Sequence, residues 1–409
     1  MSLIEEIVAQ ADEMAALRRD IHAHPELSFE EVRTADVIAA RLTEWGIAVH
    51  RGLGRTGVVG IVHGRDAGAC GRALGLRADM DALPMQEGNQ FAHASRHAGK
   101  MHGCGHDGHV AMLLAAARHL ARQRDFDGTI YLIFQPAEEG GGGARAMIQD
   151  GLFTLFPMQA VFGMHNWPGM AEGQMAVSPG PVMASSNEFK ITVRGKGGHA
   201  AMPHLVLDPV PVAAQIILAL QTIVSRNLKP VDAGVISITM VHGGEANNVV
   251  PDSVELEGTV RTFSVAVLDM IEQRMQQVVE GICAAQGMQW AFVFARDYPP
   301  TINAAPEAAL ARKVMERIVG AAQVLDQEPT MTAEDFAYML EEKPGAYCFI
   351  ANGEGAGEHR ALGHGAGPCL LHNPSYDFND RLIPLGATFW VELAKEWLGS
   401  STPTLARSA

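Results

Sequence analysis

Three apolar segments of strand length alternate with helical patterns in the first part of the chain. They cover residues 73–76, 129–134 and 160–164. An Ala- and Leu-rich helical pattern over residues 110–120 separates the first two. This alternation predicts an open α/β sheet. Ligands bind at the carboxyl ends of the strands in such sheets, so the residues directly after these segments are candidates for a functional site.

The polar residues in these positions are those of a metal site. Cys104 and His106 lie two residues apart just before the helical pattern, Glu138 and Glu139 follow the second strand, and His165 ends the third. Thiolates, imidazoles and carboxylates are the protein ligands of zinc, and a spare carboxylate can act as a base. Together these residues predict a metallohydrolase.

Two metal ions held close together need roughly five protein ligands. Our candidates are Cys104, His106, Glu139, His165 and His372. This mixed donor set suits zinc and tolerates manganese, cobalt or nickel. Each residue is weak evidence alone, since a single buried thiol or histidine is more often structural; the prediction depends on the set.

The adjacent acids need separate roles. Successive side chains of an extended backbone point to different sides, so we expect one of the two carboxylates to face a metal ion and its neighbour to face the substrate. A free carboxylate within hydrogen-bonding reach of an activated water can take its proton. The alternative is a solvated acidic pair in a loop, which their position after a buried-type strand disfavours.

Other histidines have less informative surroundings. His199 lies in a Gly-rich segment over 195–204, where we expect a loop tip that reaches into a catalytic cleft, its own or a partner subunit's. For seven others we expect surface or capping positions: His22, His24, His50, His63, His93, His97 and His119.

Composition excludes several classes of protein. The chain has 409 residues, enough for two domains, and a formal net charge of −15. That charge argues against nucleic acid and anionic membranes as partners. No apolar run approaches the ~18 residues that span a bilayer, and the N-terminus lacks the pattern of a signal peptide. We therefore expect a soluble cytoplasmic protein.

The middle of the chain changes character and predicts an inserted domain. Strand and helix patterns over residues 186–298 follow the order β-α-β-β-α-β, which is that of a ferredoxin-like unit. We therefore divide the chain into a discontinuous catalytic domain, residues 1–185 plus 299–409, and an inserted domain, residues 186–298.

Several stretches together resemble the M20 metallopeptidase family, in particular its amidohydrolase branch of aminoacylases, hippurate hydrolases and auxin-conjugate hydrolases. The matching stretches cover residues 101–109, 134–143, 195–204, 248–251 and 372–380. One difference bears on the branch: many other M20 enzymes have a ligand in a His-x-Asp motif where this chain has Arg77-Ala-Asp79. This difference favours the amidohydrolase branch over true peptidases.

The resemblance implies an aminopeptidase-like α/β catalytic domain with two metal ions, and a lid domain that usually forms a homodimer, in some cases a dimer of dimers. It implies the five ligands named above, with Glu138 as the general base. His199 resembles a histidine that stabilises the oxyanion in the neighbouring subunit's site. Asn248 and Arg261 resemble lid residues that contact the substrate carboxylate or carbonyl. Glu334 lies in another matching stretch without an assigned role.

The activity implied is hydrolysis of N-acyl amino acids, N-acetyl or N-benzoyl among them, to a carboxylic acid and an amino acid. Other activities stay open: a dipeptidase or carboxypeptidase, or a specialised catabolic amide hydrolase, with the same metal pair. A different class would use Cys104 as a covalent nucleophile, which sensitivity to chelators distinguishes. A non-catalytic binding protein is disfavoured by the complete ligand set.

Overall fold

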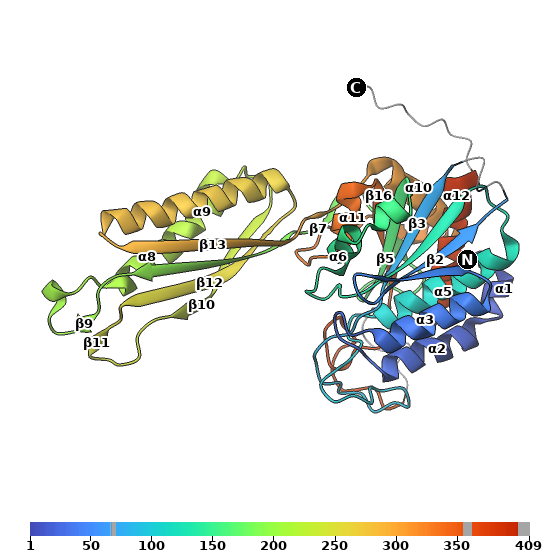
Figure 1. Ribbon diagram of the computed structural model, residues 1–409, viewed down its shortest axis with the longest axis horizontal. Coiled ribbons are helices and arrows are strands. Elements are labelled where there is room, and N and C mark those ends of the chain that lie inside the picture. Colours follow the sequence, from blue (N-terminus) through green and yellow to red (C-terminus); the bar gives the residue numbers. More distant parts are fainter. Residues whose placement is uncertain (66, 68–70, 355–361, 400–409) are drawn as a thin grey trace, which may run out of the picture. The chain divides into compact units, whose positions relative to one another are not determined.

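The computed structural model describes residues 1–65, 67, 71–354 and 362–399 (Figure 1). The chain divides into two compact units. The first contains Met1–Gly180, Asn303–Glu328 and Tyr338–Ala409, and the second contains Pro181–Ile302 and Pro329–Ala337. The borders near 180 and 302 lie five and four residues from those expected from sequence, but the segment 329–337 groups with the second unit instead of the first.

The first unit is built on an eight-stranded mixed sheet with the order β1-β2-β4-β3-β5-β16-β6-β15. Its strands are β1 (Ala48–Leu53), β2 (Gly57–His63), β3 (Ala73–Asp79), β4 (Thr129–Gln135), β5 (Ala160–Trp167), β6 (Met175–Ala176), β15 (Val324–Leu325) and β16 (Gly345–Ala351). The central strands β4, β3, β5 and β16 run parallel. β3, β4 and β5 are buried at nearly every position, which matches the apolar segments predicted over 73–76, 129–134 and 160–164.

The chain changes direction across this sheet at β3. From β3 it continues to β4 on one side, and from β4 it returns to β5 on the other side. The carboxyl ends of β4, β3 and β5 therefore lie next to one another at a topological switch point, the position at which open α/β sheets form a ligand crevice.

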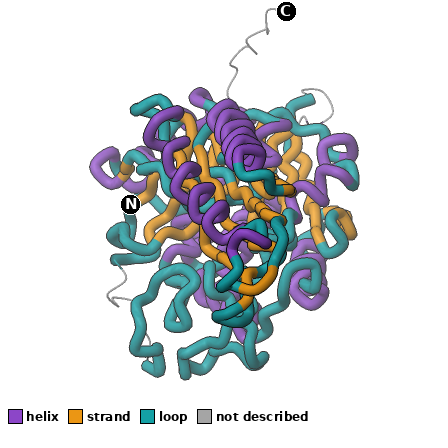
Figure 2. Tube along the Cα trace, turned by 90° about the vertical axis from the view of Figure 1, so that its left-hand side faces the viewer, coloured by secondary structure: helices purple, strands orange, loops and turns teal. Residues whose placement is uncertain are grey.

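Helices cover the sheet of the first unit, as Figure 2 shows. They are α1 (Glu5–Val8), α2 (Ala11–Ala23), α3 (Val32–Glu44), α5 (His106–Gln123), α6 (Gly143–Gln149), α7 (Leu152–Leu155), α10 (Ala305–Val319), α11 (Ala337–Glu342) and α12 (Leu382–Gly399). The buried helix α5 packs against β3 and against α2, α3 and α12. This packing fixes the start of α5 beside the ends of the parallel strands.

The second unit has a four-stranded antiparallel sheet with the order β10-β12-β8-β13. Its elements are β8 (Ser186–Arg194), α8 (Pro209–Thr222), β10 (Gly234–His242), β12 (Ser253–Thr262), α9 (Val265–Ala285) and β13 (Gln289–Tyr298). Both helices pack their apolar faces on this sheet, and the β-α-β-β-α-β order confirms the ferredoxin-like prediction.

Some predicted elements differ at their ends. Helical spacing over residues 3–23 predicts one helix, but the structure has two, α1 and α2. A second helical pattern near 333–342 gives a helix that begins only at Ala337. The side chain of Glu334 accepts the backbone N–H of Phe336 at 2.9 Å, a local bond that competes with helix formation. By contrast, α5 begins four residues before the helical pattern predicted over 110–120, so His106 is its first residue.

Candidate metal centre

The structure brings all five predicted ligands together in the first unit. Three come from the strand ends and the start of α5: Cys104 lies just before α5, His106 begins it, and His165 lies near the end of β5. Glu139 lies in the turn after β4, and His372 lies in the loop before α12. Cys104 Sγ is 3.4 Å from His165 Nε2, and His372 Nε2 is 3.1 Å from Glu139 Oε1.

The donor atoms form two groups that share one residue. Cys104, His106 and His165 place their donor atoms within 4.8 Å of one another, and so do Cys104, Glu139 and His372. Each group offers three ligand atoms, one fewer than a tetrahedral zinc site uses. Cys104 is the residue that the two groups share, so it lies beside the donor atoms of both.

Neighbouring acceptors fix which ring nitrogen of each buried histidine is free. His106 Nδ1 lies 3.2 Å from Asp81 Oδ1, and His165 Nδ1 lies 2.6 Å from the carbonyl oxygen of Asn166. A carbonyl oxygen only accepts, so Nδ1 of His165 carries the proton and Nε2 presents its lone pair. The carboxylate of Asp81 orients His106 in the same way, as groups behind metal-binding histidines commonly do.

Unsatisfied atoms and charge show that the site fits a pair of cations. Among the described residues, His106 Nε2 is buried without a hydrogen-bond partner. Glu139 Oε1 is buried as well and lies 3.1 Å from His372 Nε2 without forming a hydrogen bond to it. Burial disfavours a charged His106, yet the charges of Asp79, Asp81 and Glu139 outweigh it and raise its pKa to about 10. Such an excess of buried negative charge is stable only when it is compensated.

Cys104 has a thiol that this environment protects from ionisation. Its side chain is buried, and burial together with the charges of Glu139 and Glu138 raises its pKa well above the ordinary value. A thiolate forms here only with a cation beside it. This argues against Cys104 as a free covalent nucleophile and agrees with a metal ligand.

His109 is close to the site but has no lone pair to offer. Its Nε2 accepts the backbone N–H of Asn166 at 3.0 Å, which places the proton on Nδ1, 2.5 Å from Asp79 Oδ1. Asp79 therefore holds His109, and His109 holds Asn166, whose side-chain amide donates to the carbonyl oxygen of Cys104 at 2.6 Å. Asp79, Asp81 and His109 were not predicted as site residues, although Asp79 ends β3 and Asp81 lies two residues later, where polar residues are informative.

The acidic pair lies in a turn and not in extended backbone, so the reason given for separate roles was wrong. Residues 138–141 form this turn, and Ala137 before it has the left-handed φ of 53°. The backbone N–H of Glu139 donates to Asp81 Oδ2 at 3.0 Å. Glu138 is buried and has a carboxylate oxygen within 4.8 Å of donor atoms of His106 and Glu139. The turn therefore keeps both acids at the site.

His372 has a strained backbone that its surroundings hold. Its φ is 60°, which a residue with a Cβ rarely adopts, and its N–H donates to the carbonyl oxygen of Gly103 at 2.8 Å. The side chain is about half exposed, in contrast to the buried His106 and His165. This loop contact therefore brings a predicted ligand that is distant in sequence beside Cys104.

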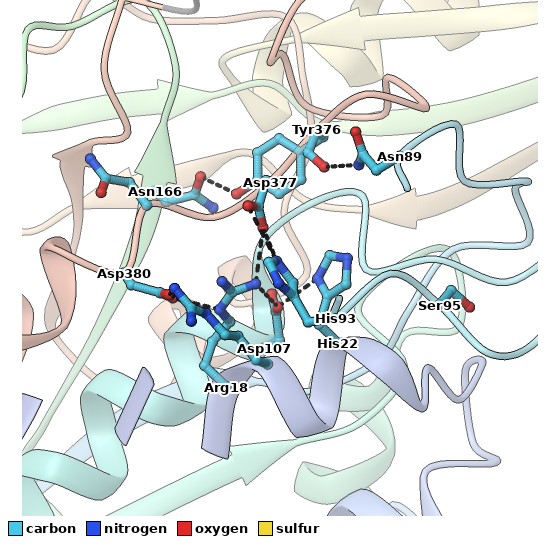
Figure 3. Close-up of polar contacts among 12 residues, drawn as sticks. Arg18, His22, Asn89, His93, Ser95, Asp107, Asn166, Tyr376, Asp377 and Asp380 are labelled. Atoms are coloured by element: carbon cyan, nitrogen blue, oxygen red, sulfur yellow. Dashed lines mark hydrogen bonds and ion pairs between the residues drawn. The ribbon is translucent and has the colours of Figure 1, made fainter. Parts of the chain in front are cut away.

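Behind the site lies a network of buried charges that the sequence did not reveal (Figure 3). Arg18 of α2 contacts Asp377, Asp380 and Asp107 at 2.9, 2.7 and 3.4 Å. His22, one turn further, lies 2.8 Å from Asp107. Burial lowers the pKa of His22, but Asp107 and Glu87 reverse this and raise it to about 9.

The surface positions predicted for His22 and His119 are therefore wrong, because both side chains are buried. Each lies opposite a carboxylate that is distant in sequence, Asp107 for His22 and Glu6 for His119, which is 2.9 Å away. Only the packing of α2 and α1 against α5 brings these pairs together.

The other three predicted site residues belong to the second unit. His199 is exposed in the short strand β9 (Gly198–His199), which pairs with β11 (Val249–Val250), and Ala200 N–H donates to the carbonyl oxygen of Asn248. Arg261 lies near the carboxyl end of β12, the end farther from β11 in sequence. It is half-buried and donates to Thr259 Oγ1. The structure thus places His199 beside Asn248 and away from Arg261.

Together, the parallel sheet, the switch point and the two donor groups define a hydrolase of the two-metal type. The family model for peptidase family M20/M25/M40 matches residues 75–396, and the chain belongs to this family. A hippurate hydrolase from Campylobacter jejuni is 38% identical, over 97% of this chain and 100% of its own. An N-acetyl-L-cysteine deacetylase from Bacillus subtilis is 39% identical, over 95% of this chain and 89% of its own.

A solved structure agrees with the fold. The dinuclear metal-binding M20 peptidase from Bacillus subtilis is 34% identical and has a TM-score of 0.82, over 96% of this chain and 99% of its own. The chain is therefore a metal-dependent amidohydrolase of the M20 family with a site for two divalent ions.

Proposed function

We propose that this enzyme hydrolyses N-acyl amino acids, N-acetyl or N-benzoyl among them, to a carboxylic acid and a free amino acid. The observation that carries the proposal is the pair of donor groups joined at Cys104, with Glu138 beside them. The names of the two relatives support the substrate class, since both describe removal of an acyl group from an amino acid. The peptidase named for the solved structure supports a dipeptidase or carboxypeptidase as the second candidate.

The proposed ligands are Cys104, His106, Glu139, His165 and His372. When bound, two divalent ions polarise the amide carbonyl and lower the pKa of a water. Glu138 takes the proton of the attacking water and passes it to the leaving amine. His199 donates a hydrogen bond to the oxyanion, and Asn248 and Arg261 hold the substrate carboxylate or carbonyl. Zinc or manganese fits this mixture of thiolate, imidazole and carboxylate best, and cobalt and nickel fit as well.

The first test is a panel of N-acetyl, N-benzoyl and indoleacetyl amino acids with simple dipeptides, with free amino acid as the readout. We expect metal-dependent cleavage of the N-acyl amino acids. Cleavage of dipeptides alone would assign the enzyme to the peptidases instead. Chelation should abolish activity, and zinc, manganese or cobalt should restore it.

A spectrum tests the ligands without using activity. With two equivalents of cobalt, we expect a thiolate-to-cobalt charge-transfer band that disappears in Cys104→Ala. Cys283→Ala is the control, because this buried cysteine lies in the core of the second unit. If the band persists without Cys104, the proposed ligand set is wrong.

We further propose a soluble cytoplasmic homodimer with neither nucleic acid nor membrane as partner. The acidic net charge of −15 supports the last two points. One helical stretch, Pro209–Asn227, has the length and mean hydropathy of 1.3 that a membrane span requires, with a third of it buried. Its buried face belongs to the core of the second unit.

The solvent-exposed face of α8 supports dimerisation. Leu218 on α8 is 72% exposed, and β10, an edge strand of the sheet, exposes Met240 and Val241. An exposed apolar helix next to an unpaired strand edge is typical of a surface that another chain covers.

Leu218→Glu should therefore produce a monomer with little activity, because each site then lacks the partner's His199. We expect the dimer dissociation constant to rise about 30-fold or more, the usual effect of losing a central contact. Light scattering after size-exclusion chromatography measures the state, and Leu155→Glu, on the exposed side of α7 in the first unit, is the control. A fully active monomer would contradict the proposal.

A further inference from the structure

Glu31 is a buried carboxylate without a role in the chemistry described above. It lies just before α3 and its residue is 0% exposed. Its Oε1 accepts the backbone N–H groups of Phe29 and Ala137, both at 2.9 Å, and its Oε2 accepts the hydroxyl of Thr56 at 2.6 Å. One carboxylate thus joins three segments that are distant in sequence.

The two residues whose N–H groups it binds have the same unusual backbone. Phe29 has a φ of 65° and Ala137 a φ of 53°. Residues with a Cβ rarely adopt this left-handed conformation, and they persist in it where surrounding contacts hold them. Ala137 is completely buried and directly precedes Glu138 and Glu139.

The segment before Glu31 supports the same turn from a second side. Ser28 Oγ donates to the carbonyl oxygen of Glu139 at 3.2 Å and lies 3.1 Å from Asp81 Oδ2. Asp81 in turn accepts the N–H of Glu139. The turn that carries both acids is therefore held by Glu31 at its start and by Ser28 and Asp81 at Glu139.

We propose that Glu31 is a positioning residue that holds Ala137 in its left-handed conformation and so directs Glu138 and Glu139 into the metal centre. The assignment of Glu138 as base and Glu139 as ligand rests on the proposed function. Burial, reinforced by the charge of Asp81, raises the pKa of Glu31 to about 7, so the tests should run at pH 8, where its carboxylate is charged.

The test is a double-mutant cycle of Glu31→Ala and Ala137→Gly. Glycine adopts positive φ without strain, so it should keep the turn without the carboxylate. We expect Glu31→Ala to weaken metal binding and to lower kcat about 10–100-fold at little changed KM. Ala137→Gly alone should change little, and the double variant should recover most of both losses. Glu31→Gln should retain activity, because its amide oxygen still accepts both N–H groups.

Thr56→Val is the matched control, since it removes only the bond to the other oxygen of Glu31. It should lower the melting temperature without changing kcat or metal affinity. The double variant should also stay less stable than the wild type, because Phe29 and Thr56 still lack their acceptor. A purely structural role would instead move kcat and melting temperature together in every variant.

Metal binding by calorimetry separates this inference from the proposed function. If the wild type cleaves no amide, the metal affinities still show whether Ala137→Gly rescues Glu31→Ala. If the wild type is active and glycine at 137 restores neither affinity nor kcat, the inference is overturned and the proposed function stands. Unchanged affinity and kcat in Glu31→Ala would overturn it as well.

Discussion

Glu138→Gln is expected to remove almost all activity while leaving both metal ions in place. The amide has the size of the carboxylate but cannot take a proton, and loss of a general base costs about 10²–10⁴-fold in rate. The loss should be in kcat, with little change in KM, because the substrate contacts proposed for Asn248 and Arg261 are untouched. Steady-state kinetics and metal analysis of the same sample measure both quantities.

The neighbouring acid provides the control. Glu139→Gln changes the same charge one residue later, at an oxygen 3.1 Å from His372 Nε2 and 4.0 Å from His106 Nε2. It should lower the metal content or affinity, and its activity should recover in part at high metal concentration. If both variants lose metal equally, or if Glu138→Gln stays active, the separate roles proposed for the two acids are wrong.

Arg18→Met is expected to have the largest effect on stability. Arg18 is 1% exposed and contacts three carboxylates that come from α5 and from the loop after His372. The carboxylates outweigh the effect of burial and raise its pKa above its usual value, so it is charged at every accessible pH. Removing one partner of a buried ion network leaves charges uncompensated and costs about 3–5 kcal/mol.

Arg19→Met is a matched control for this prediction. Arg19 is the next residue on α2 and pairs with the other oxygen of Asp380 at 2.7 Å, but its side chain is 53% exposed. An exposed ion pair contributes about 0–1 kcal/mol. Urea unfolding of the metal-free protein, followed on the transition of the first unit, should separate the two variants. Equal losses would show that the buried network adds no stability beyond a surface pair.

Arg18→Met also tests how the loop that carries His372 is held. Asp377 and Asp380 follow His372 by five and eight residues, and Tyr376, directly before Asp377, donates to Asn166 Oδ1 at 2.6 Å (Figure 3). Since Arg18 binds both aspartates, its loss should also weaken metal binding at His372.

Local patterns in the sequence were sufficient for the fold class and for the residue types of the site. The apolar segments 73–76, 129–134 and 160–164 appear within β3, β4 and β5, and the alternation with helices is enough to expect a parallel sheet with a crevice at its carboxyl edge. The ferredoxin-like order of the second unit followed in the same way. These features depend on neighbours in sequence, which side-chain periodicity records directly.

The tertiary structure alone decided how the site is held. Asp81 orients His106, His109 is excluded as a ligand because both nitrogens are occupied, and Glu31 reaches Ala137 across more than one hundred residues of chain. The same applies to His22. It was predicted at the surface, but it is buried beside Asp107 because α2 packs against α5. Such contacts join segments whose patterns contain no information about each other, because hydrogen bonds and buried charges depend on where packed elements meet. The sequence by itself thus determined most of the elements and the residue types proposed as ligands, and only packing decided which lone pairs, turns and charges surround them.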